Sequence, residues 1–220
     1  MSAAARQPLA WPDLPAPDRR YTEAEYLAFD AQAEGRWEFH RGRITPVGEP
    51  GWSAPPDPKF MAGASPRHYQ LASTLLRLLF SRLPKGCRPF ASDARVHIPL
   101  TGGYAYPDVV VVCGELEFQN PDVALPALTN PVVIVEILSE TTADYDRFGK
   151  FARYRSITSL RQYVLLDSRQ ARAEVLTRRE ADEWTYELLL LPAEMVRFAA
   201  GECAVTLSEL YEGLLPFEEV

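Results

Sequence analysis

Two acidic residues lie in apolar, strand-like stretches of this sequence, where a carboxylate is expensive to place. Asp108 stands in "YAYPDVVVV" (104–112) and Glu136 in "PVVIVEILS" (131–139). A buried carboxylate is strongly destabilising unless a cation or hydrogen bonds compensate it. Because side chains alternate between the faces of a strand, neighbouring strands would place both carboxylates side by side on one face. Adjacent carboxylates repel unless they are protonated or share a cation, and carboxylate oxygens suit Mg²⁺ or Mn²⁺.

A basic residue follows this pair on the next predicted helix. Asp146, Lys150 and Tyr154 are spaced i, i+4 and i+8, which places them on one stripe. Two carboxylates that bind a metal, together with a nearby ammonium, are the groups needed to hydrolyse a phosphodiester. Structural alternatives stay open: Asp108 could cap the turn after Pro107, Glu136 could pair with an arginine, and Asp146–Lys150 could be a surface ion pair.

The elements that position these residues are a mixed set of helices and strands. A capping box at Thr22 and Glu25 predicts the start of a helix, and Arg41-Gly42 predicts the turn of a hairpin over 36–47. The remaining expectations are helices at 68–83, 142–157 (capped by Thr141 or Thr142) and 206–213, strands at 107–113, 131–138 and 161–167, an antiparallel pair at 171–178 and 183–191, and a strand or bent hairpin over 87–100. This order indicates an α/β or α+β domain with a mixed sheet flanked by helices.

Composition bounds the class of protein. The chain has 220 residues, 47% of them hydrophobic, which is typical of a globular protein, and a formal net charge of −7 argues against non-specific coating of nucleic acid. We expect a flexible tail over 1–20, a single domain over 21–220 and an irregular loop over 47–66.

The cysteines Cys87, Cys113 and Cys203 form no C-x-x-C pair, so we expect no disulfide framework or zinc site, with Cys113 as a small core residue. Without a secretion signal or membrane span, a cytoplasmic location is expected.

Several blocks together resemble a known family. "YAYPDVVVV", "PVVIVEILSETTADYDRFGKFARYRSI" and "RQYVLLD" are similar to the Uma-type putative restriction endonuclease family of bacteria, part of the PD-(D/E)xK nuclease superfamily. Upstream, "YTEAEYLAF", "RWEFHRGRI" and "SPRHYQLASTLLRLL" look like that family's opening helix, its glutamate-bearing hairpin and its histidine-led helix. The resemblance covers roughly residues 21–190.

The resemblance implies a restriction-endonuclease-like fold and a metal-dependent endonuclease acting on DNA, with Mg²⁺ or Mn²⁺ as cofactor. It implies metal ligation by Asp108 and Glu136, completed by Glu38 and the backbone carbonyl of Ile137. A homodimer without membrane attachment is also expected on these grounds. For Glu38, the structural alternative is an exposed hairpin residue paired with an arginine such as Arg36 or Arg41.

His68 and Leu138 are the positions where the resemblance is less direct. His68 matches the family's histidine and could contact substrate, although a satisfied structural histidine is the commoner role at a helix start. Leu138 stands where the superfamily's common Glu-x-Lys motif has its lysine, and Lys150 matches the relocated lysine of the Uma-type family. If Lys150 does not reach the metal site, the chain would instead be a catalytically inactive module that binds nucleic acid or protein.

Overall fold

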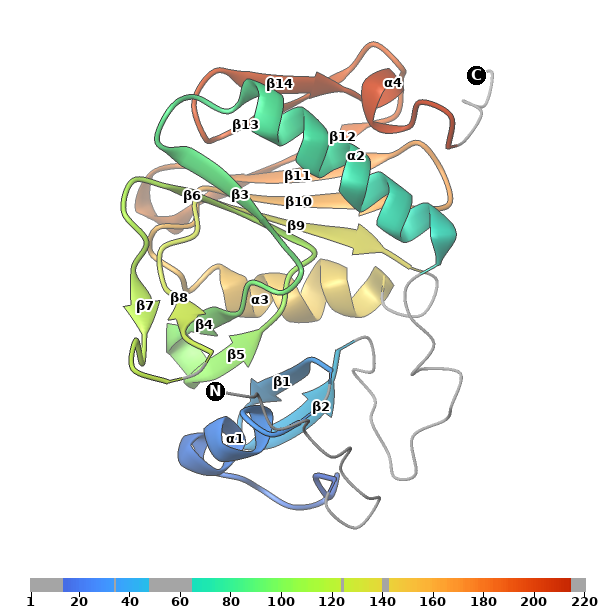
Figure 1. The fold of residues 1–220 in the computed structure, drawn as a ribbon. Coiled ribbons are helices and arrows are strands. Elements are labelled where there is room, and N and C mark those ends of the chain that lie inside the picture. The colour runs from blue at the N-terminus through green and yellow to red at the C-terminus, as the bar shows by residue number, and fades with distance from the viewer. Residues whose placement is uncertain (1–13, 34, 48–64, 124, 140–142, 215–220) are drawn as a thin grey trace, which may run out of the picture.

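A central β-sheet with helices on both faces dominates the structure, and a second sheet adjoins it (Figure 1). The structure is a computed structural model that describes residues 14–33, 35–47, 65–123, 125–139 and 143–214. The predicted mixed sheet flanked by helices is therefore confirmed. Within these ranges, no helix has both the length and the apolar character needed to cross a membrane.

The central sheet contains both parallel and antiparallel neighbours. Its order is β12-β11-β10-β9-β6-β3, and the only parallel neighbours among these described strands are β9 and β10. The strands are β3 (Cys87–Ala91), β6 (Val109–Cys113), β9 (Val133–Leu138), β10 (Gln162–Asp167), β11 (Ala173–Arg178) and β12 (Trp184–Leu189). β9 and β10 are buried along their whole length, which explains why both read as continuous apolar runs.

Helix α2 (Pro66–Arg82) covers one face of the central sheet (Figure 1). Its side chains Leu71, Leu75, Leu78 and Leu79 are buried against the alternate strand residues that point to this face. Ser65 caps the helix, because its side chain accepts a hydrogen bond from the amide of His68. The hairpin of β13 (Met195–Phe198) and β14 (Cys203–Thr206), with helix α4 (Leu207–Leu210), completes the cover of this face.

The opposite face of the sheet carries a helix that begins as a π-helix. The π-helical segment η3 (Tyr145–Lys150) continues directly into α3 (Phe151–Tyr154). π-Helical turns within helices are rare and are found frequently at functional sites. The predicted helix at 142–157 is confirmed over these residues, whereas the predicted caps Thr141 and Thr142 lie outside the described ranges.

The second sheet has the order β2-β1-β5-β4-β8-β7. Its strands are β1 (Trp37–His40), β2 (Arg43–Pro46), β4 (Val96–Ile98), β5 (Gly103–Ala105), β7 (Phe118–Gln119) and β8 (Ala127–Leu128). Helix α1 (Glu23–Asp30) packs on it through Tyr26 and begins with the predicted capping box. The predicted hairpin turn is also present, with positive φ at Arg41 and Gly42. Among the described residues there are also two short 3₁₀ segments, η2 (Pro99–Thr101) and η4 (Glu180–Asp182).

The chain crosses between the two sheets at several points, and one of these crossings corrects the expectation for residues 87–100. β3 belongs to the central sheet and β4 to the second sheet, so the segment does not form a hairpin. The return crossing runs from β5 to β6, and Asp108 lies at this crossing, one residue before β6 begins. Sequence periodicity could not show the crossing, because both strands have ordinary local patterns.

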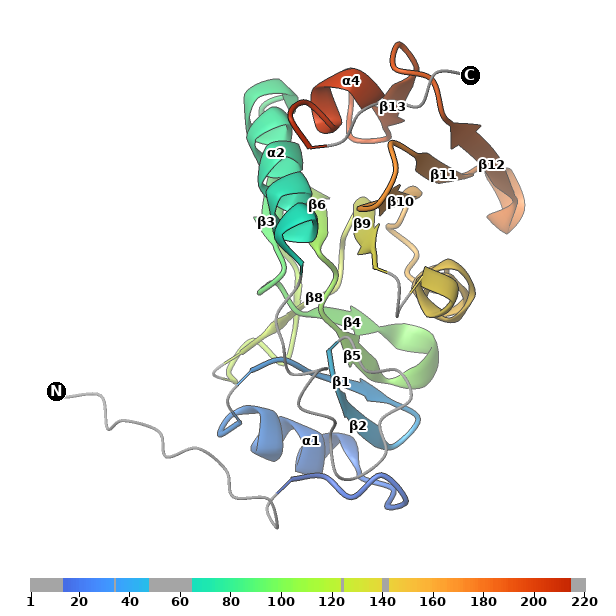
Figure 2. The ribbon, with the colours of Figure 1, turned by 90° about the vertical axis from the view of Figure 1, so that its right-hand side faces the viewer.

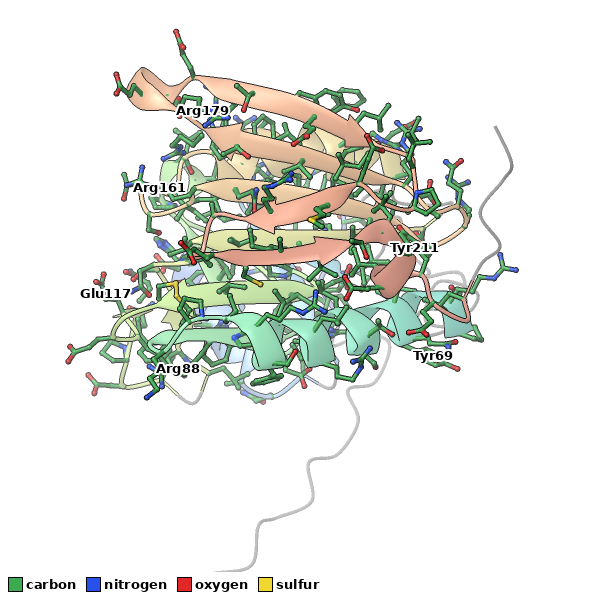
Figure 3. All side chains as sticks on the ribbon, turned by 90° about the horizontal axis from the view of Figure 1, so that it is seen from above. Tyr69, Arg88, Glu117, Arg161, Arg179 and Tyr211 are labelled. Atoms are coloured by element: carbon green, nitrogen blue, oxygen red, sulfur yellow. A yellow bond between two sulfur atoms is a disulfide. The ribbon has the colours of Figure 1, made fainter. Side chains whose placement is uncertain are left out.

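A disulfide joins Cys87 of β3 to Cys113 of β6, which contradicts the expectation that the cysteines form no disulfide framework. The two residues are direct partners in the antiparallel register, with Cα atoms 4.0 Å apart. The sequence concealed this pair because 26 positions separate the cysteines along the chain. Figure 3 shows the disulfide at the end of the molecule where Glu117 is labelled, away from Tyr69 at the start of α2.

Two other expectations are changed or left open. Residues 14–20 of the predicted tail contact the folded chain: the Tyr21 hydroxyl accepts a hydrogen bond from the amide of Ala16, and Leu14 packs beside the core around α1. Residues 1–13, and positions 48–64 of the predicted loop, lie outside the described ranges.

Candidate active site

The register of β6 and β9 brings the two predicted carboxylates together. These strands are antiparallel neighbours in which Val109 pairs with Val135, so the next pair in the same register is Asp108 and Glu136. Electrostatic repulsion between the two carboxylates contributes to the pKa of Glu136. Both acidic groups therefore lie at one end of the central sheet, where the chain arrives from the second sheet.

Asp108 is held by two donors, one from each side. The backbone amide of Ile137 donates to Oδ2 of Asp108 at 2.7 Å, and Nε2 of His68 lies 3.2 Å from the same oxygen. Burial by itself would raise the pKa of Asp108, but His68, Lys150 and the Ile137 amide outweigh it and lower that pKa. Asp108 is therefore an anion, and it does not serve as the cap of an isolated turn.

Glu136 is almost completely buried and accepts hydrogen bonds from a cation and a phenol. Nζ of Lys150 lies 3.0 Å from Oε1 of Glu136, and the hydroxyl of Tyr154 donates to the same oxygen at 2.9 Å. Burial, joined by the negative charges of Asp108 and Asp146, raises the pKa of Glu136 well above its usual range, although Lys150 acts in the opposite direction. The alternative pairing of Glu136 with an arginine is wrong.

Lys150 is positioned by the helix that follows β9. It extends from the end of η3, and its Nζ also lies 3.0 Å from Oδ1 of Asp146, one turn earlier. The Lys150 side chain is 10% exposed and the Asp146 side chain 3% exposed, so the alternative of a surface ion pair is wrong. Burial would lower the pKa of Lys150, but Glu136, Asp146 and Glu38 raise it well above its usual value.

Glu38 belongs to a second buried ion pair beside the first. It comes from β1, and its Oε2 accepts a hydrogen bond from Nη1 of Arg153 at 3.1 Å. Arg153 also donates to the Tyr145 hydroxyl at 2.6 Å. The alternative of an exposed Glu38 paired with Arg36 or Arg41 is therefore wrong.

Sequence reasoning missed Arg153 and Tyr145. The available signal was weak: both lie on the helical segment that carries Lys150, and Arg153 follows Lys150 by three positions, a spacing that brings side chains to neighbouring positions on a helix. Through Arg153, a helix that packs on the central sheet is tied to β1 of the second sheet.

Leu138, at the position of the superfamily's usual motif lysine, is a core residue. It is 1% exposed and packs with Ile134 and Leu165 on the face that α3 covers. The only cation that an ion pair places on Glu136, within the described part of the chain, is Lys150.

The residues present suit a divalent cation held by few side chains. No cluster of three or more His, Cys, Asp or Glu side chains with metal-binding geometry occurs among the described residues. Mg²⁺ characteristically keeps several waters and uses only one or two carboxylates, which Asp108 and Glu136 supply. Oε1 of Glu38 is buried and accepts no hydrogen bond from the described chain, so this oxygen is open to a further ligand.

Comparison with known proteins gives two kinds of likeness. A family model named Uma2, with the description "Putative restriction endonuclease", matches residues 58–201, which is more than half of the chain. Two proteins of Synechocystis sp. (strain ATCC 27184 / PCC 6803 / Kazusa) are similar in sequence. "Uncharacterized protein sll1609" is 37% identical over 166 residues, covering 74% of this chain and 84% of the relative. "Uncharacterized protein slr1290" is 27% identical over 170 residues, covering 77% and 80%.

A solved structure shares the fold. It is the crystal structure of a "putative nuclease belonging to DUF820" from Anabaena variabilis ATCC 29413, with a TM-score of 0.66 and 16% sequence identity. The likeness covers 87% of this chain and 98% of that chain. The predicted restriction-endonuclease-like fold is thereby confirmed.

Proposed function

Since the chain belongs to the Uma2 family, described as "Putative restriction endonuclease", we propose that it is a metal-dependent endonuclease that hydrolyses phosphodiester bonds in DNA. The family and the shared fold support a nuclease-like function in general. The observation that carries the finer proposal is the convergence of Asp108 and Glu136 on adjacent strands, with the Lys150 ammonium 3.0 Å from Glu136.

In this proposal, Asp108 and Glu136 hold Mg²⁺ or Mn²⁺, with Glu38 and the Ile137 carbonyl as further ligands. A bound divalent cation would supply a water of lowered pKa and a Lewis acid for the scissile phosphate. The two carboxylates suit this role. Asp108 is anionic, and Glu136 would become anionic once a bound cation offsets burial and the negative charge of Asp108, which both raise its pKa.

The other side chains orient these groups. His68 and the Ile137 amide fix Asp108, and the Tyr154 hydroxyl fixes one oxygen of Glu136. Lys150 keeps its proton because two carboxylates flank it, so it remains a cation that can offset negative charge developing on the phosphate. No covalent intermediate with the protein is needed.

A catalytically inactive binding module is the second candidate. Two observations favour it: Leu138 replaces the usual lysine of the motif, and the net charge of −7 argues against non-specific coating of nucleic acid. In this case Lys150 would serve only to neutralise the buried Glu136 and Asp146.

Cleavage of supercoiled plasmid and of matched DNA and RNA oligonucleotides distinguishes the two candidates. We expect DNA cutting with Mg²⁺ or Mn²⁺ that EDTA abolishes and that is lost in Asp108→Asn and Glu136→Gln. Glu117→Gln is the matched control, because Glu117 is exposed and lies at the other end of the molecule (Figure 3). No cutting of either nucleic acid with any divalent metal would contradict the nuclease proposal, and cutting of RNA alone would contradict DNA as the substrate.

A further inference from the structure

Strand β12 forms an edge of the central sheet (Figure 2), and several of its apolar side chains are exposed. Tyr186 is 57% and Leu188 39% exposed, and Leu190 and Leu191 continue the apolar surface beyond the strand. Natural edge strands are usually protected by proline, by charge or by a covering element. β3, at the opposite edge, contains Pro89 and packs against α2. β12 has no proline, and no other described strand pairs with its outer edge.

The hydrogen-bonding groups at this edge can be assigned from the ladder. The Arg179 amide donates to the Glu183 carbonyl at 2.7 Å, which marks a hydrogen-bonded pair between the two strands. Antiparallel pairs alternate in type, so Thr185 and Glu187 bond inward to β11. The backbone groups of Trp184, Tyr186 and Leu188 therefore point outward, away from the sheet.

The sequence of β12 selects one self-complementary register for these outward groups. If two copies of β12 pair antiparallel with Tyr186 at the two-fold axis, Trp184 of each copy faces Leu188 of the other. Each of these three pairs is of the hydrogen-bonded type and exchanges two backbone bonds. Thr185 then faces Glu187 of the other copy, which allows a hydroxyl-to-carboxylate hydrogen bond.

The neighbouring registers are less favourable. Centring the pair on Glu187 would place two glutamates directly opposite each other, about 4.5 Å apart at their Cα atoms. Centring it on Leu188 would pair Tyr186 with Leu190, whose amide already donates to Oε2 of Glu194 at 2.7 Å. Of these three registers, the one centred on Tyr186 leaves no like charges or occupied donors in the interface.

We propose that β12 is the interface for a second copy of this chain, joining two central sheets into one continuous sheet about a two-fold axis at Tyr186. The axis runs perpendicular to the joined sheet, because both strands lie in its plane. Strand register places Trp184, Tyr186 and Leu188 on the same face as Glu136, so both copies present Glu136 and α3 on one face. This inference does not depend on the chemistry of the site.

The mass of the full-length protein in solution tests the interface. Light scattering after gel filtration, over a wide range of concentrations, should give twice the 24.7 kDa of one chain. Tyr186→Lys should give the monomer mass, because two ammonium groups would meet at the axis. Tyr186→Pro should do the same, since it removes an outward amide and leaves the ladder with β11 intact.

Tyr69→Lys is the matched control, because Tyr69 is also a tyrosine with 57% exposure and lies at the start of α2 (Figure 3). This variant should remain dimeric, and circular dichroism should be the same for every variant compared. The register is tested by Thr185→Cys/Glu187→Cys, which should form an inter-chain disulfide on mild oxidation, whereas Thr185→Cys alone should not. A monomeric wild type, a dimeric Tyr186→Lys protein, or no crosslink in the double variant would overturn the inference.

Discussion

Replacing Lys150 by methionine tests whether this ammonium neutralises a buried pair of carboxylates. Lys150 contacts Glu136 and Asp146 at 3.0 Å each, and both carboxylates have side chains that are 3% exposed. Removing one partner of a buried ion pair typically costs about 3–5 kcal/mol, because the remaining charge stays buried. We therefore expect Lys150→Met to lower the free energy of unfolding by about 3–5 kcal/mol near neutral pH, which corresponds to roughly 6–20 °C in Tm for a chain of this size.

The loss should depend on pH with a defined sign. Burial and nearby negative charges already raise the folded-state pKa of Glu136, and without Lys150 this pKa should rise further above its unfolded value. A group with a raised folded-state pKa stabilises the fold below its unfolded pKa, and this contribution is lost as the pH rises through the folded pKa. The difference between wild type and Lys150→Met should therefore be largest near neutral pH and should shrink as the pH falls toward about 4.

Urea unfolding of both proteins at a series of pH values measures this difference. Lys85→Met is the matched control: Lys85 is exposed after α2, and its replacement should change stability by less than about 0.5 kcal/mol. If Lys150→Met behaved like Lys85→Met, or if its loss of stability were independent of pH, Lys150 would not be the cation that neutralises this cluster.

Three further predictions concern groups outside the Lys150 pair. Replacing both Cys87 and Cys113 by serine should lower the free energy of unfolding by about 2–4 kcal/mol, and reductant should destabilise the wild type but leave the double variant unchanged; equal responses would contradict a formed disulfide. Burial, aided by the positive charges of Arg153 and Arg41, lowers the pKa of His40 to about 4. Because the unfolded state then binds a proton more readily than the folded state, the free energy of unfolding should decrease as the pH is lowered from about 6.5 to 4. The expected decrease is about 1–2 kcal/mol after allowance for the partial exposure of His40, and His40→Gln should flatten this slope in unfolding curves measured at different pH values. Arg153→Met should be more destabilising than Arg153→Met combined with Glu38→Gln, because the double change leaves no buried carboxylate unpaired; additive effects in this double-mutant cycle would show that the pair is not coupled.

Local signals in the sequence were sufficient for several elements and for part of the site. The capping box at Thr22 and Glu25 and the Arg41-Gly42 turn each depend on residues a few positions apart, and both occur as predicted. The expected alternation along the strand at 131–138 is also present, with Ile134 and Leu138 on one face and Val133 and Val135 on the other. Glu136 could therefore be assigned to a face before its neighbours were known.

Features that depend on contacts between distant segments were not predictable in this way. The Cys87–Cys113 disulfide requires the register between two strands, which the long intervening segment does not reveal. The Glu38–Arg153 pair requires knowledge of how the second sheet lies against α3, and that depends on where the chain crosses between the sheets. The predicted strand at 183–191 is a similar case: its alternation was visible in the sequence, whereas the position of β12 at an edge of the sheet was not.

A crystal of the protein soaked in MnCl₂ gives the most direct test of the proposed active site. Anomalous scattering from manganese identifies the ion independently of the protein density. We predict a peak within about 2.5 Å of carboxylate oxygens from both Asp108 and Glu136, with Lys150 still directed at Glu136. Anomalous density found only elsewhere, or an Asp108–Glu136 pair that stays free of manganese while Lys150 turns away, would contradict the proposed metal-dependent site.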